Sequence, residues 1–66
     1  MTKIMELRKR YGLSIAGLCY ETRVHPTTLS MVERRKMVAS GRVRESVSSF
    51  FEIPENEAFG TDGFAL

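Results

Sequence analysis

Apolar residues recur every three or four positions along most of the chain, a pattern that predicts short helices rather than strands. Ile4, Leu7 and Tyr11 follow this spacing and predict a first amphipathic helix over residues 2–11. Gly12 predicts the end of that helix, because glycine adopts the left-handed conformation of a helix stop at little cost.

The next two helices are predicted from the residues that open them. Ser14 can cap a second helix over about 14–22, since its hydroxyl can accept a hydrogen bond from a free backbone N–H. His25 precedes Pro26 and is therefore biased toward the extended conformation that a helix cap requires. A third helix is expected over about 26–35.

The remaining sequence predicts two more helices and a tail. Ser40 can cap a fourth helix, in which four apolar residues at i, i+4, i+7 and i+8 share one face. These residues are Val43, Val47, Phe50 and Phe51. Pro54 opens a short fifth helix over about 54–59, and the tail 60–66, which contains two glycines, is expected to be flexible or to contact a second copy.

The composition describes one small domain. Of the 66 residues, 42% are hydrophobic and 27% charged, so residues 1–59 are expected to form a single folded unit. One cysteine excludes an intrachain disulfide and a zinc site of four thiolates. The longest apolar run, Ile15–Tyr20, cannot span a bilayer, and no signal peptide is visible, which predicts no membrane partner and a cytoplasmic location.

Charge divides the chain into a basic and an acidic part. Residues 1–36 hold eight Lys/Arg and three Asp/Glu, a net charge of +5, and residues 37–66 hold two Arg and five Asp/Glu, a net charge of −3. This division indicates a face that binds a polyanion, although charge alone is also compatible with solvated helix surfaces.

The second and third helices, joined by Thr22-Arg23-Val24, form a helix-turn-helix. The segment LSIAGLCYETRVHPTTLSMVERRK, residues 13–36, closely resembles the helix-turn-helix of the Cro-like and phage-repressor family of bacterial regulators, also called the xenobiotic-response-element family. The resemblance continues over residues 3–59. It implies an all-α fold, a compact bundle of about five short helices of the lambda-repressor-like DNA-binding type.

The resemblance also implies how the two helices pack. The family has apolar residues at Leu18, Val24, Leu29 and Val32 and a small residue at Cys19, which fix the angle at which the third helix projects. Arg23 and Arg35 stand where the family commonly has glycine, and Ile15 replaces a common phosphate-binding glutamine. The departure at Arg23 implies a strained turn, the one at Arg35 lengthens the basic cluster, and the one at Ile15 leaves one phosphate contact in doubt.

An ion pair between Arg8 and Glu33 is implied in the same way. In the family such a pair bridges the first and third helices. A buried pair would stabilise the fold by several kcal/mol against loss of one partner. An exposed pair would contribute at most about 1 kcal/mol.

The family places the start and outer face of the third helix in the major groove. Carried over by position, the base-facing residues are Pro26, Thr27, Ser30 and Met31. Only the two hydroxyls among them can hydrogen-bond to bases, so direct readout is sparse, and Met31 is equally compatible with a plain surface residue. The residues placed for backbone phosphates are His25, Thr28, Arg34, Arg35 and Lys36. The run Arg34–Lys36 is alternatively a solvated helix end.

The predicted function is a sequence-specific transcriptional regulator, a repressor that binds a pseudo-palindromic operator in double-stranded DNA as a homodimer. Phe59, Phe64 and Leu66 are candidates for the dimer surface, with a core position as the alternative for Phe59. The alternative function is a protein-interaction module of the same fold, antitoxin-like or anti-repressor. An enzyme, a metal site, a cofactor and a small-molecule substrate are not expected, since His25 has no second ligand near it and Cys19 lies on a packing face.

Overall fold

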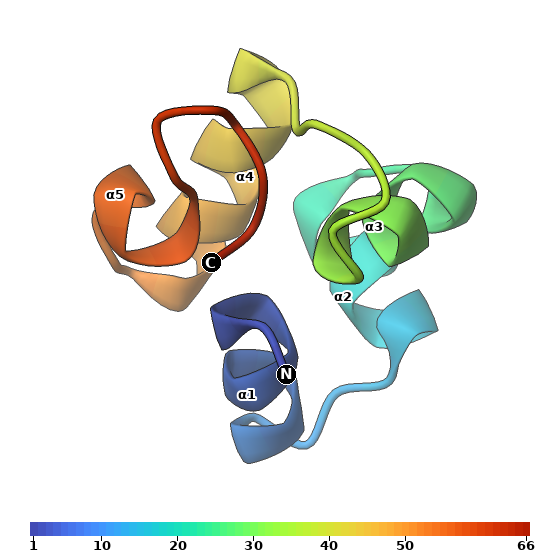
Figure 1. The fold of residues 1–66 in the computed structure, drawn as a ribbon. Helices are drawn as coiled ribbons and strands as arrows, with labels where there is room; N and C mark the ends of the chain where they lie inside the picture. Colours follow the sequence, from blue (N-terminus) through green and yellow to red (C-terminus); the bar gives the residue numbers. More distant parts are fainter.

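Five helices account for the regular structure of the computed structural model, which describes all 66 residues and contains no strand. They are α1 (Lys3–Arg10), α2 (Ile15–Thr22), α3 (Pro26–Glu33), α4 (Gly41–Phe51) and α5 (Glu55–Ala58). In Figure 1, α3 lies on the right and α5 on the left, with α1 and α4 between them. The all-helical prediction is therefore confirmed.

Local signals in the sequence set the helix ends. The Ser14 hydroxyl accepts a hydrogen bond from the Gly17 N–H at 3.0 Å, and the Ser40 hydroxyl accepts one from the Val43 N–H at 3.3 Å. Gly12 has φ +70°, which ends α1 as predicted. The fifth helix is shorter than predicted, because Pro54 lies before its first turn as the N-cap rather than inside it.

The core joins all five helices and the tail. Fourteen apolar residues are buried in one cluster, including residues 4 and 7 of α1, 29 and 32 of α3, and 43, 47 and 51 of α4. The apolar positions predicted from helical spacing are buried, except that Phe50 is half-buried and Tyr11 exposed. The rings of Tyr11 and Phe51 nevertheless meet edge to face, with centroids 5.1 Å apart. No helix is long and apolar enough to cross a membrane.

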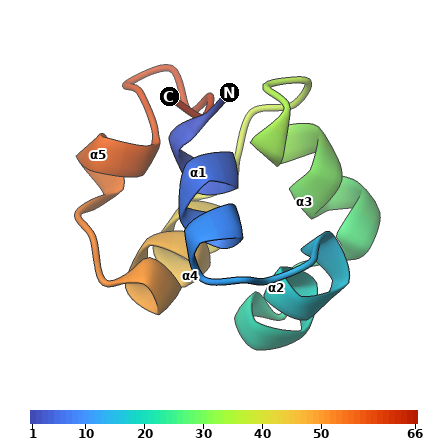
Figure 2. The same cartoon turned by 90° about the horizontal axis from the view of Figure 1, so that it is seen from below.

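The tail 60–66 is packed onto the body, which corrects the expectation of a flexible extension. Ala65 is fully buried, and the Leu66 N–H donates to the Ala58 carbonyl at 2.9 Å. The Lys3 N–H donates to the Leu66 carbonyl at 2.6 Å, so the two ends of the chain lie side by side (Figure 2). Gly63 has φ +86°, a conformation that glycine adopts at little cost. Glycine in this tail therefore makes the turn back onto the body and does not indicate mobility.

Phe59 occupies a core position, which confirms the alternative predicted for it and removes it from the dimer surface. It is only 3% exposed and pairs with Ala65 in an isolated antiparallel bridge, so it belongs to the core of one chain. Phe64 is half-buried and Leu66 is 53% exposed, which leaves these two as the solvent-facing apolar residues of the tail.

Candidate nucleic-acid interface

Helix α3 begins as its sequence predicts. Pro26 occupies the first turn, and the ring Nδ1 of His25 accepts a hydrogen bond from the Thr27 N–H at 3.2 Å. Accepting at Nδ1 requires the proton to lie on Nε2, so this exposed ring presents an N–H donor to solvent at the start of the helix.

The angle between α2 and α3 is set by the five residues that the resemblance singled out. Leu18, Leu29 and Val32 are fully buried, Val24 is 4% exposed and Cys19 is 7% exposed. Between the helices, Arg23 adopts the left-handed conformation with φ 60° and ψ 30°. The predicted burial of these five residues is confirmed. One side of α3 therefore packs against the core together with α2.

The far end of α3 is tied to α1. Arg8 donates from Nε to Glu33 Oε2 at 2.8 Å and from the terminal nitrogen Nη2 to Glu33 Oε1 at 3.0 Å. The side chains are 16% and 4% exposed, so this is the buried form of the pair. The Glu33 hydrogen bond raises the pKa of Arg8, and the Thr2 hydroxyl donates to the Glu33 carbonyl at 2.8 Å.

The outer face of α3 carries the four residues placed there for base contacts. Pro26 and Thr27 are exposed, and Ser30 and Met31 are half-buried. No other element hydrogen-bonds to these side chains except Arg34, which follows the helix.

Arg34, which was predicted to contact a backbone phosphate, lies against Ser30 and Met31, two of the residues predicted to face bases. Its Nε donates to the Ser30 carbonyl at 3.2 Å, and a terminal nitrogen lies 3.9 Å from the Met31 sulfur. The guanidinium is therefore folded back along α3 instead of standing free with its neighbours. These contacts span only three and four residues, and Arg34 is the C-cap of α3.

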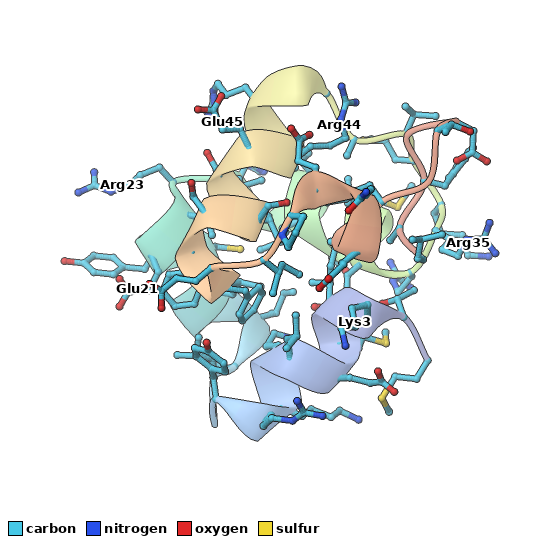
Figure 3. All side chains as sticks on the ribbon, turned by 90° about the vertical axis from the view of Figure 1, so that its left-hand side faces the viewer. Lys3, Glu21, Arg23, Arg35, Arg44 and Glu45 are labelled. Carbon is cyan, nitrogen blue, oxygen red and sulfur yellow. The ribbon has the colours of Figure 1, made fainter.

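The other phosphate-contact candidates lie at the two ends of α3. His25 is exposed and Thr28 half-buried at its start, whereas Arg35 and Lys36 are exposed after its end. Figure 3 shows Arg23 and Arg35 projecting away from the body on opposite sides. Neither forms an ion pair, so both charges are available to an anion.

Sequence reasoning missed a cationic hollow beside the start of α3. Arg42 donates from a terminal nitrogen to the Arg23 carbonyl at 3.4 Å, and the Arg23 guanidinium lies 5.9 Å from the centroid of the Tyr20 ring. Together with His25 and Pro26, these residues line an open hollow of ≈ 540 Å³. No local pattern could have placed residue 42 beside residue 23.

The single cysteine, Cys19, is among the residues that line this hollow and is buried. Burial raises the pKa of Cys19, so the thiol stays protonated at neutral pH and is a poor nucleophile. No three His, Cys, Asp or Glu side chains gather closely enough to hold a metal ion. The arrangement offers charge and hydrogen-bond donors rather than reactive groups.

Comparisons of the chain with protein-family models, with curated proteins and with solved structures gave no match. Any assignment of function therefore depends on the geometry and charge of the residues described above.

Proposed function

We propose that the chain is a sequence-specific DNA-binding regulator, a cytoplasmic repressor that inserts α3 into the major groove of its operator. The observation that carries this proposal is the outer face of α3, which no other helix hydrogen-bonds to and which has cations at both ends. The diameter of an α-helix with its side chains, about 10–12 Å, matches the width of the major groove, about 12 Å.

The charged residues around α3 support contacts to both sides of such a groove. Arg23 and Arg42 lie beside its start, and Arg35 and Lys36 follow its end. Each phosphate that they neutralise adds about 0.9 to the dependence of log affinity on log salt concentration. These contacts position the protein and do not distinguish sequences.

Sequence preference is assigned to a few side chains on the outer face. The Thr27 and Ser30 hydroxyls can bond to base edges, and Met31 can contact a thymine methyl group. Arg34, which lies beside Ser30 and Met31, adds the guanidinium that the predicted base-facing set lacked.

Two copies are needed to bind an operator tightly. The chain measures 27 × 21 × 21 Å, less than the spacing of about 34 Å between half-sites one helical turn apart. A homodimer on a pseudo-palindromic site follows, with Phe64 and Leu66 as the exposed part of the proposed dimer surface.

The test is selection of a site from random DNA duplexes, followed by titration of the selected duplex at several salt concentrations. We expect two chains per duplex and a salt slope that falls by about 0.9 for each of Arg35 and Lys36 replaced by glutamine. Thr27→Ala and Met31→Ala are each expected to change the preference among sequences about fivefold, which corresponds to the low end of the 1–3 kcal/mol that a good bidentate base contact contributes. Lys9→Gln removes one exposed charge from α1 and serves as the matched control for Lys36→Gln.

A second function competes with this one because hydroxyls are the only hydrogen-bonding groups among the four residues first assigned to bases. That function is a protein-interaction module of the same fold, antitoxin-like or anti-repressor. Recovery of no preferred duplex, together with no DNA binding at low salt, would reject the repressor and favour this module.

A further inference from the structure

One of the four methionines lies against a guanidinium on the outer face of α3. The Met31 sulfur is 3.9 Å from the terminal nitrogen Nη2 of Arg34. No hydrogen-bond donor contacts the sulfur of the other three methionines. Met31 is half-buried, so part of its side chain is accessible to solvent, at the edge of the molecule where α3 lies (Figure 2).

A second contact holds the Arg34 guanidinium in this place. Its Nε donates to the Ser30 carbonyl at 3.2 Å, which lays the planar group along α3 beside Met31. Arg34 forms no ion pair, so no carboxylate draws it away from the helix. The Nη2 donor therefore faces a poor partner, because a thioether sulfur accepts hydrogen bonds only weakly.

Oxidation of the Met31 sulfur would turn this weak acceptor into a strong one. A sulfur lone pair attacks one oxygen of hydrogen peroxide, the O–O bond breaks and an S–O bond forms. The proton of the transferred hydroxyl passes to the departing hydroxide, which leaves as water. Sulfur loses two electrons to the peroxide, and the product is methionine sulfoxide, a polar side chain. Its oxygen forms on the atom that already lies beside the Nη2 donor.

The same change acts on the base contacts, so the consequence for DNA rests on the proposed function. Met31 is assigned an apolar contact to a thymine methyl group, which a polar sulfoxide does not provide. A hydrogen bond from Nη2 to the sulfoxide oxygen also keeps Arg34 on the helix, away from base edges. Arg35 and Lys36 form no hydrogen bond with Met31, so their phosphate contacts are unchanged.

We propose that Met31 is a site of reversible oxidation by hydrogen peroxide. Its sulfoxide binds Arg34 and lowers affinity for the operator, while binding to DNA of other sequences is kept. A dithiol returns the sulfoxide to the thioether and becomes a disulfide as water is released, a reaction that methionine sulfoxide reductases catalyse. Oxidation of the exposed Met1 or Met37 does not have this effect, because neither residue lies on α3.

The first measurement needs no DNA. The chain is treated with dilute hydrogen peroxide, peptide mass spectrometry identifies the oxidised methionines, and NMR follows the Nε–H signal of Arg34. We expect this signal to shift as Met31 sulfoxide accumulates and to return after treatment with the reductases and dithiothreitol. Met31→Leu removes the sulfur and should show no shift. An unchanged Arg34 signal after complete oxidation of Met31 would overturn the proposal.

The second measurement compares the affinity of each variant for the selected duplex before and after peroxide. Met37→Leu is the matched control, because it removes an exposed methionine outside α3 and retains Met31. Peroxide should weaken binding about tenfold in the unaltered chain and in Met37→Leu, but less than about twofold in Met31→Leu. Affinity for a scrambled duplex should change less than about twofold in all three chains. Equal losses in the two variants, or on the two duplexes, would overturn the proposal.

The two measurements separate this proposal from the proposed function. An unoxidised chain that binds no duplex rejects the repressor, whereas the Arg34 signal still decides whether the sulfoxide binds the guanidinium. A chain that binds its operator equally well with and without Met31 sulfoxide keeps the repressor and rejects the regulation. Circular dichroism spectra should coincide before and after peroxide, since Met31 lies outside the buried core. A loss of helical signal on oxidation would mean general unfolding and would also overturn the proposal.

Discussion

Two short helices of this chain begin beside a proline and finish in opposite surroundings. α3, which starts at Pro26, keeps its outer face in solvent and is held by its ends and its inner side. α5, which follows Pro54, also exposes residues 55–57, but Ala58 and Phe59 at its end lie in the core, where the returning tail packs against them. The comparison shows that similar opening signals do not determine what the end of a helix packs against, because the segment that follows the helix decides it.

The turns that follow the two helices differ, whereas the turn before each holds a charged residue at positive φ, Arg23 before α3 and Glu52 before α5. Arg23 and Arg35 have positive φ beside α3, although glycine would adopt this conformation with less strain. The tail uses Gly63 at its positive-φ position, where the backbone packs closely against Val38. Both arginines are exposed, so we infer that their side chains contribute charge rather than packing.

The largest effect is expected at the ion pair that holds α3. Arg8→Ala leaves the buried Glu33 carboxylate without its partner and should lower the free energy of unfolding by about 3–5 kcal/mol. Glu55→Gln breaks the pair beside α5, where the carboxylate is half exposed, and should cost at most about 1 kcal/mol. Urea unfolding followed by circular dichroism measures both changes. Equal losses would show that the two helices are held in the same way, and Arg8→Met with Glu33→Leu should recover most of the larger loss.

A smaller effect is expected in the turn of the tail. Gly63→Ala should destabilise the fold by about 2 kcal/mol, because a side chain is strained at positive φ and would also clash with Val38. The added Cβ atom would lie 2.7 Å from Val38 Cγ1. Gly41→Ala is the matched control, since the nearest atom lies 3.6 Å away in the flexible Arg44 side chain. Thermal unfolding should separate the two variants, and similar melting temperatures would refute a tightly packed tail.

The smallest effect is expected at the turn after α3, with the opposite sign. Arg35→Gly should raise the free energy of unfolding by about 0.5 kcal/mol, because strain at positive φ is relieved. The added entropy of the unfolded chain offsets part of this gain. The same substitution should weaken DNA binding through loss of a phosphate contact. Chemical denaturation and a DNA titration of one preparation test both parts. A destabilised variant would mean that the Arg35 side chain supports the fold.

Most helix boundaries could be predicted from the sequence. The Ser14 and Ser40 caps, the proline at position 26 and the left-handed Gly12 act on backbone groups within four residues, so they are readable without tertiary structure. The packing of the tail could not be predicted in this way. A Gly-containing segment is compatible with mobility, and only the neighbouring Ala58 and Lys3 backbone groups hold it in place.

The candidate sites, too, contain some features that the sequence predicts and others that only the tertiary structure shows. The charges that follow α3 belong to a basic run, residues 34–36, next to a predicted helix, so they can be identified from the sequence. The contact of Arg42 with Arg23 joins residues 19 positions apart and depends on how α4 crosses the two-helix unit.

The sequence by itself determined five helices, their opening residues and a basic half beside an acidic one. The tertiary structure alone decided which faces remained free, where the tail came to rest and which polar atoms lost contact with water. The physical reason is range: capping and helical periodicity act between neighbouring residues, whereas burial results from the packing of all the helices together.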